Sequence, residues 1–237
     1  MTDWIKARPI AHRGLHDKAN GIFENTLSAA KAAIAGNFSI EIDIHLSADG
    51  IPFVFHDNTL DRLTGETGPV RALKMAELEQ IAIGGTQDRI PSLASFLDTV
   101  NGSTGLVIEM KGIAGEDEGF VSRILEVVED YRGPLALMSF NHWLLHDARA
   151  LNATVPLGLT AEGDEKLDPT HRHADREYRP DFLSYGISDL PNGFVREFRE
   201  TGRPVITWTI WSVEDMAKSA KYADQITFEG FDPDANS

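Results

Sequence analysis

The sequence contains no cysteine, which excludes structural disulfides and thiolate ligands for a metal. Basic residues are also few, because 22 Lys and Arg stand against 37 Asp and Glu and give a formal net charge of −15. This balance argues against a nucleic-acid-binding protein, and an anionic substrate would need local cations to bind. No segment approaches the roughly 20 apolar residues of a membrane span, and the N-terminus resembles no signal peptide. We therefore expect a cytoplasmic protein with no stable membrane insertion.

The length and composition are those of an ordinary globular protein. The chain has 237 residues, of which 42% are hydrophobic and 25% are charged. A single α/β barrel commonly occupies about 250 residues. We therefore expect residues 1–237 to form one catalytic domain, while the sequence leaves the oligomeric state open.

The segment 39–57 predicts two short strands joined by a turn at Asp49 and Gly50. Successive side chains of a strand point to opposite faces, so Glu41 and Asp43 share one face, about 7 Å apart along the chain. Three isoleucines occupy the other face, as in a buried strand. Unpaired carboxylates removed from water cost several kcal/mol each. The pattern therefore points to a hard divalent metal ion, and the second strand ends just before His56.

Hydrophobic periodicity predicts alternating strands and helices along the whole chain. Principal strands are expected at 9–11, from 39 onward, and at 105–111, 135–138, 155–159, 182–187, 205–210 and 225–228. Helices are expected from a cap at Asn25 to residue 36, and at 74–81, 91–100, 118–131, 143–151, 194–200 and 213–222. Residues 162–180 are predicted to form a charged loop with a poor helix.

Eight such units favour a closed (β/α)8 TIM barrel, with residues 57–90 as a small insertion on the rim after the second strand. A doubly wound open sheet is the main alternative. The glycines near the first strand do not form a dinucleotide-binding fingerprint, which disfavours that alternative.

Polar residues collect at the carboxyl ends of the first three principal strands, where barrel enzymes place their chemistry. They are His12, Arg13, Glu41, Asp43, His56, Glu109 and Lys111. Carboxylate oxygens suit Mg²⁺ or Ca²⁺, and Arg and Lys suit a phosphate. Two histidines suit proton transfer to and from reacting oxygens. Together these residues indicate metal-assisted cleavage of a phosphate ester.

The order and spacing of several motifs resemble the glycerophosphodiester phosphodiesterase family. The motifs are HRG at 12–14, ENT at 24–26, EIDIHLSADGIPFVFHDNTLDRLTG at 41–65, IPSL at 90–93, IEMK at 108–111 and, more faintly, TWT at 207–209. The resemblance implies a barrel with an insertion after the second strand. It also implies hydrolysis of glycerophosphodiesters to an alcohol and glycerol 3-phosphate, within lipid and glycerol metabolism. In some members a glycerol hydroxyl is thought to attack first and form a cyclic phosphate.

Roles for individual residues follow from the same resemblance, position by position. Glu41, Asp43 and Glu109 match the metal ligands of the family. His12 and His56 match its general acid–base pair, and Arg13 and Lys111 match its phosphate-contacting residues. Which histidine is the acid, and whether the metal is Mg²⁺ or Ca²⁺, stay open.

The sequence departs from the family pattern mainly near its C-terminal end. Trp208 and Thr209 are followed by Ile and Trp, where the family usually has a hydrophobic residue and Asn. The family's last strand usually ends in Thr-Asp near a proline, whereas residues 227–233 here read TFEGFDP, and Phe23 replaces a common proline. These changes touch the wall that faces the substrate, so the alcohol moiety stays open. Trp208 either lines the glycerol pocket or is buried in the barrel core.

Several residues have two readings. Asp57 either orients His56 or caps the following turn, and the turn is slightly favoured. Glu24 is either a partner of Arg13 or an acidic residue near a helix N-terminus, and the second is favoured. His45 is not expected to bind a metal. His171 and His173 are expected to be solvated.

Two further functions compete with hydrolysis of glycerophosphodiesters. A non-catalytic relative that only binds phosphate would be expected to lose a histidine or a metal carboxylate, and none is missing here. A phosphodiesterase acting on lysophospholipids or other phosphodiesters would need an apolar or basic rim. The acidic composition argues mildly against that rim. The expected partner is therefore a small-molecule phosphodiester.

Overall fold

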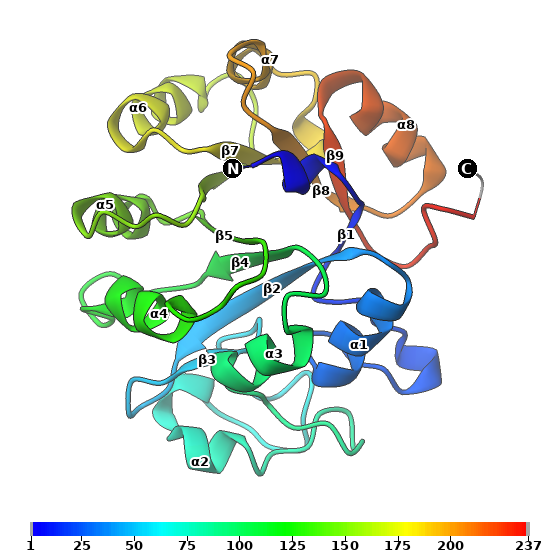
Figure 1. Cartoon of the computed structure of the whole chain (residues 1–237), viewed down its shortest axis with the longest axis vertical. Coiled ribbons are helices and arrows are strands. Elements are labelled where there is room, and N and C mark those ends of the chain that lie inside the picture. Colours follow the sequence, from blue (N-terminus) through cyan, green and yellow to red (C-terminus); the bar gives the residue numbers. More distant parts are fainter. Residues whose placement is uncertain (1, 236–237) are drawn as a thin grey trace.

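The computed structural model describes residues 2–235, and its parallel strands close into a barrel (Figure 1). Within that range the eight parallel strands are β1 (Ile10–Ala11), β2 (Ser39–Leu46), β4 (Leu106–Met110), β5 (Leu135–Ser139), β6 (Leu157–Ala161), β7 (Phe182–Gly186), β8 (Val205–Ile210) and β9 (Gln225–Phe228). They follow the order β1-β9-β8-β7-β6-β5-β4-β2, and β1 also pairs with β2, which closes the ring. The short strand β3 (Pro52–Val54) pairs antiparallel with β2. The predicted TIM barrel is thus confirmed.

Helices surround the barrel on the outside (Figure 1). They are α1 (Leu27–Ala35), α2 (Met75–Leu78), α3 (Leu93–Val100), α4 (Phe120–Val128), α5 (His142–Ala150), α6 (Asp168–Tyr178), α7 (Gly193–Glu200) and α8 (Val213–Tyr222), with the 3-10 turns η2 (Lys18–Asn20) and η4 (Ile187–Asp189) between elements. Ser92 caps α3 through the N–H of Ser95, as its position near the predicted start suggests. The cap of α1 is Thr26, not the predicted Asn25. No described helix is both long and apolar enough to cross a membrane.

The prediction for residues 162–180 was wrong, because they contain the 11-residue helix α6. Its composition is charged, but Pro169 lies in the first turn, where a missing N–H costs nothing. His171 and Ala174 supply a buried stripe. His171 packs 5.5 Å from the ring of Phe194 and is not solvated, whereas His173 is exposed as expected.

The segment between β3 and α3 has a hydrophobic cluster of its own, separate from the main core. It contains η3 (Val70–Ala72) and α2, which is shorter than predicted. Arg71 of η3 forms an ion pair with Asp117 in the loop after β4 and donates to the carbonyl oxygen of Lys111 at 3.2 Å. The segment is therefore tied to the β4 end of the barrel.

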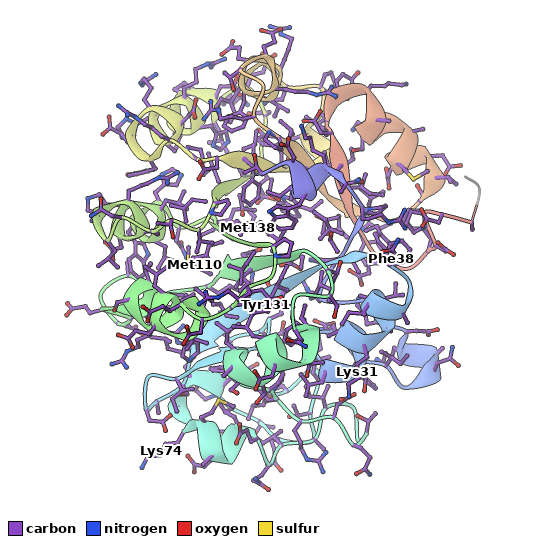
Figure 2. The ribbon with its side chains drawn as sticks, viewed as in Figure 1. Lys31, Phe38, Lys74, Met110, Tyr131 and Met138 are labelled. Atoms are coloured by element: carbon purple, nitrogen blue, oxygen red, sulfur yellow. The ribbon has the colours of Figure 1, made fainter. Side chains whose placement is uncertain are left out.

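The N-terminal end of the barrel is covered by the short helix η1 (Asp3–Lys6), which crosses the middle of the ring in Figure 1. Ile5 is fully buried there in a cluster with the inward side chains of several strands. Met138 of β5 belongs to this inner cluster, whereas Met110 of β4 packs in the outer core (both labelled in Figure 2). The opposite, carboxyl end of the barrel is where the polar strand-end residues gather.

Candidate active site

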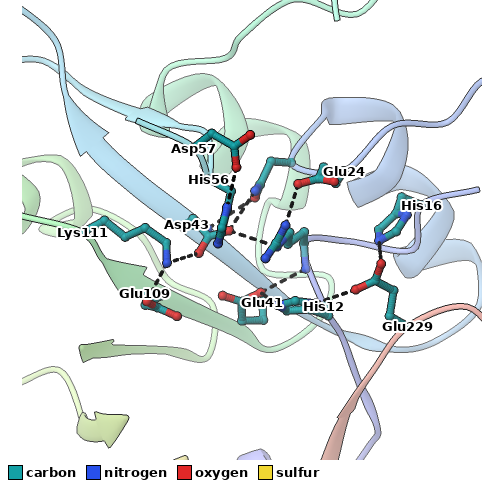
Figure 3. A network of polar contacts seen from close by, with 12 residues as sticks. His12, His16, Glu24, Glu41, Asp43, His56, Asp57, Glu109, Lys111 and Glu229 are labelled. Atoms are coloured by element: carbon teal, nitrogen blue, oxygen red, sulfur yellow. Dashed lines mark hydrogen bonds and ion pairs between the residues drawn. The ribbon is translucent and has the colours of Figure 1, made fainter. Parts of the chain in front are cut away.

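Three carboxylates from two neighbouring strands lie together at the carboxyl end of the barrel (Figure 3). Glu41 and Asp43 extend from β2 and Glu109 from β4, and Asp43 and Glu109 are register partners in the parallel pairing. One oxygen from each of the three lies within 4.8 Å of the others. All three are buried, with 1%, 1% and 9% of their surface exposed. The alternation of polar and apolar residues in β2 produces this geometry directly.

The cluster has more negative charge than its neighbours neutralise. Burial, with the charges of Asp43 and Glu109, raises the pKa of Glu41 well above its usual value. Burial also opposes ionisation of Asp43, but Lys111 and nearby cationic groups outweigh it and lower that pKa to about 2. Lys111 Nζ lies 3.1 Å from Asp43 Oδ1 and 2.8 Å from Glu109 Oε1. Glu41 Oε1 is buried without a hydrogen-bond partner among residues 2–235, so a divalent cation fits these oxygens.

His12 borders the carboxylates on one side and is held from behind by a residue that the sequence did not reveal. It follows β1, and its Nε2 lies 3.9 Å from Glu41 Oε2. Its Nδ1 lies 2.8 Å from Oε2 of Glu229, which follows β9, and Oε1 of Glu229 lies 3.2 Å from His16 Nε2. Burial opposes ionisation of Glu229, but hydrogen bonds from the two histidines lower its pKa to about 2. The only sign of this residue in the sequence was that residues 227–233 depart from the family pattern.

His56 borders the cluster on the other side, just after β3 (Figure 3). Its Nδ1 lies 2.7 Å from Asp57 Oδ1, so the slightly favoured reading of Asp57 as a turn cap was wrong. Arg62 holds the other oxygen of Asp57 at 2.6 Å. Buried His45 donates from Nε2 to the carbonyl oxygen of His56 at 3.1 Å, which fixes the backbone there.

Arg13 points into the site from the loop after β1, where its backbone has a φ of 56°. Its Nε lies 3.5 Å from Asp43 Oδ2, and its Nη1 donates to Glu24 Oε1 at 2.7 Å. The favoured reading of Glu24 as a helix-terminal acid was therefore wrong, because it holds Arg13. Asn25 was also misread, since its Nδ2 donates to Asp43 Oδ2 at 2.9 Å.

A cavity of about 110 Å³ joins all of the predicted site residues. Its lining includes His12, Arg13, Glu41, Asp43, His56, Glu109, Lys111 and Trp208. Trp208 lies on the cavity wall rather than wholly within the core, and its ring packs edge-on at 5.4 Å against Phe140. A more open pocket of about 510 Å³ adjoins this cavity and shares four lining residues with it, His56, Glu109, Lys111 and Phe140.

Comparison with known proteins agrees with this geometry. A glycerophosphodiester phosphodiesterase of Caldanaerobacter subterraneus subsp. tengcongensis is 29% identical over 227 residues, which cover 92% of this chain and 91% of the relative. The structure of a phosphodiesterase of Oleispira antarctica, in complex with the product sn-glycerol-3-phosphate, superposes with a TM-score of 0.84 at 26% identity, over 95% of this chain and 94% of that one.

A glycerophosphodiester phosphodiesterase of Thermotoga maritima shares the fold, with a TM-score of 0.76 at 24% identity over 92% of each chain. The model of the glycerophosphoryl diester phosphodiesterase family matches residues 12–226, which include the strands from β2 to β8. The chain therefore belongs to the glycerophosphoryl diester phosphodiesterase family and is a hydrolase of phosphoric diesters.

Proposed function

We propose that the chain hydrolyses glycerophosphodiesters to an alcohol and glycerol 3-phosphate, using a divalent metal ion and two histidines. One observation carries the proposal: two histidines, each held at Nδ1 by a carboxylate, border a buried cluster of three acidic side chains. A carboxylate at Nδ1 fixes the tautomer and orientation of an imidazole and leaves Nε2 for proton transfer. The same arrangement occurs on both sides of one cavity, for His12 and for His56.

Glu41, Asp43 and Glu109 hold Mg²⁺ or Ca²⁺ in this proposal. The ion, when bound, stabilises the negative charge that develops on the phosphate oxygens. Arg13 and Lys111 contact the same phosphate, and their own carboxylate partners keep both cations in place. Local positive charge of this kind allows an anionic diester to approach a chain whose net charge is −15.

The two histidines receive different roles from the cavities that they line. His56 lines both the small cavity and the open pocket, whereas His12 lines the small cavity and not the open pocket. We assign the open pocket to the alcohol, so His56 gives its proton to the leaving oxygen. His12 takes a proton from the attacking hydroxyl, which belongs to water or to the glycerol itself. A bond from phosphorus to the attacking oxygen forms, and the bond to the alcohol oxygen breaks.

Lysophospholipids are a second candidate substrate class. Ile113 and Phe140 line the open pocket with 37% and 39% of their surface exposed. Apolar side chains at that position suit the acyl chain of a lysophospholipid, which is attached to the glycerol. Such a substrate would bind with its acylglycerol in the open pocket and its other alcohol in the small cavity.

A panel of phosphodiesters tests the proposal. Glycerophosphocholine, glycerophosphoethanolamine, a lysophosphatidylcholine and a diester without glycerol are each incubated with Mg²⁺ and, separately, with Ca²⁺. We expect metal-dependent release of glycerol 3-phosphate from the first two substrates, measured by a coupled dehydrogenase assay. Absence of glycerol 3-phosphate release from both glycerophosphodiesters with either metal would overturn the proposed function. Lysophosphatidylcholine gives lysophosphatidic acid instead, so its turnover is followed through choline, and faster choline release than from glycerophosphocholine would favour the second substrate class.

A further inference from the structure

The wall of the small cavity contains buried hydroxyl groups that the chemistry above does not use. Thr160 of β6, Ser184 of β7 and Thr227 of β9 are 3%, 0% and 1% exposed, and all three line the cavity. Their hydroxyl oxygens have no hydrogen-bond partner among residues 2–235. The indole Nε1 of Trp208, in the same wall, also lacks one. Three hydroxyls and one N–H thus face a single cavity without partners.

Several buried hydroxyls elsewhere in the barrel are paired. Ser139 donates to the carbonyl oxygen of Met110 at 2.7 Å, and the hydroxyls of Thr207 and Ser219 lie 2.6 Å apart. Leaving a buried polar group unpaired costs about 1–3 kcal/mol, so several in one cavity need a compensating ligand. The contrast indicates that the wall is built to receive polar groups from a bound molecule.

Two of the three hydroxyls lie away from the phosphate-binding groups. β6 and β7 lie across the barrel from β2, which carries Glu41 and Asp43, and Thr160 and Ser184 are register partners on neighbouring strands. Hydroxyls are neutral and both donate and accept, so they suit the hydroxyls of an alcohol better than a phosphate. The cavity of about 110 Å³ holds only a small group.

We infer that Thr160, Ser184, Thr227 and the indole N–H of Trp208 form a subsite for the glycerol hydroxyls of the substrate. The variable alcohol then lies in the open pocket beyond Lys111, where about 510 Å³ is available. This inference rests on the proposed function and deepens it, because it names the part of the diester that enters the barrel. Selectivity for glycerol comes from hydroxyl groups that stay unpaired when a substrate lacks its own.

Two chromogenic diesters that differ by one hydroxyl test the subsite. Glyceryl 4-nitrophenyl phosphate is compared with 2-hydroxypropyl 4-nitrophenyl phosphate, which keeps the hydroxyl beside the phosphate but lacks the terminal one. We expect wild-type kcat/KM to be about tenfold or more higher for the glyceryl ester. Equal values for the two esters would overturn the inference, because the cavity would then hold water alone.

Variants then assign the preference to the wall. Thr160→Val, Ser184→Ala and Thr227→Val, singly and together, are expected to lower the glyceryl-to-hydroxypropyl ratio toward 1, by about two- to tenfold for each hydroxyl. The ratio is insensitive to general damage, which slows both esters alike. Ser219→Ala removes a buried hydroxyl that is paired outside the cavity and should keep the wild-type ratio. An unchanged ratio in the triple variant would contradict the inference.

A binding measurement keeps the subsite testable if catalysis fails. Glycerol 3-phosphate is expected to raise the melting temperature of the wild-type protein, with Mg²⁺ present, more than 2-hydroxypropyl phosphate does. The difference should disappear in the triple variant, and single variants serve if the triple variant does not fold. Equal shifts by the two ligands would overturn the subsite. Failure to cleave any glycerophosphodiester would instead overturn the proposed function, so the two failures are distinguishable.

Discussion

Oε2 of Glu229 lies 2.8 Å from Nδ1 of His12, although 217 positions separate the two residues in the sequence. The pairing brings the end of β9 to the end of β1, and β1 and β9 are hydrogen-bonded neighbours in the ring. Burial raises the pKa of Glu229, but His12 and His16 outweigh this effect and lower the pKa to about 2. The carboxylate is therefore ionised at neutral pH. It can therefore hold the His12 ring with Nε2 toward Glu41.

Removing this carboxylate should slow the reaction through His12. Glu229→Gln keeps an acceptor but loses the charge, and Glu229→Ala loses both. We expect kcat to fall about tenfold and about 100-fold respectively, as for outer partners of other catalytic or ligating histidines. Steady-state kinetics on glycerophosphocholine measure the effect. His16→Asn is the control, because it removes the second contact of Glu229 and leaves that of His12 intact. Wild-type kcat in Glu229→Ala would show that the contact is incidental.

The proposed roles of the histidines predict opposite responses to the leaving group. His12→Ala and His56→Ala should each lower kcat on glycerophosphocholine by about 10²-fold or more. 4-Nitrophenolate leaves without protonation, so His56→Ala should recover most of its activity on glyceryl 4-nitrophenyl phosphate. His12→Ala should stay slow on both substrates. Recovery by His12→Ala instead would reverse the assignment, and recovery by neither would remove the acid role from both residues.

The carboxylate cluster predicts two ways to stabilise the protein. A bound metal ion neutralises the repulsion among the three carboxylates, and replacing one carboxylate by a neutral side chain reduces it. Glu41, Asp43 and Glu109 repel one another in a buried site, and a bound cation relieves that repulsion. We expect EDTA to abolish activity and lower the melting temperature, and Mg²⁺ or Ca²⁺ to restore both. Glu41→Gln should lose the metal-dependent rise, while its metal-free form melts no lower than the metal-free wild type.

Calorimetry with each metal in turn checks the cluster directly. Glu24→Gln provides a matched control, because Glu24 is an acidic residue bound to Arg13 that lies outside the three-carboxylate group. Its melting temperature should still rise with metal. If the melting temperature of Glu41→Gln rose with metal as much as that of the wild type, the ion would not bind at this cluster.

Much of the barrel and its acidic cluster could be predicted because the relevant physics is local. The alternation in residues 40–45 puts two carboxylates on one strand face, and strands β8 and β9 follow their predicted bounds. The carboxylate partner of His12 could not be predicted from local sequence, because Glu229 lies beside His12 only when β9 pairs with β1 in the closed barrel. Thr160 and Ser184 look like ordinary strand residues, and only their shared, partnerless burial distinguishes them.

Charged segments were harder to read than apolar ones. In α6 a few buried side chains, His171 among them, outweigh a polar composition. Asn25 resembled a helix cap, but its side chain is used by Asp43, which lies on another element. In both cases tertiary contacts decide the outcome over local preference.

His45 makes the stability of the fold dependent on pH. Burial is the main reason that its pKa falls from 6.5 to about 4. Below pH 6.5 His45 binds a proton in the unfolded chain but not in the folded chain. The stability that neutral His45 contributes is therefore fully present above pH 6.5 and is lost as the pH falls toward 4. Its Nδ1, 3.3 Å from Arg71 Nη1, accepts from that cation and also needs a neutral ring.

Urea unfolding at pH 7 and at pH 4.5 measures this dependence. The His45 contribution to the free energy of unfolding should fall by about 2 kcal/mol between these values. His45→Gln, which does not titrate, should show a pH dependence smaller by that amount, even though its stability at pH 7 is lower. His173→Asn changes an exposed histidine and should retain the wild-type dependence. If His45→Gln and the wild type lost stability in parallel, another group would be responsible for the acid sensitivity.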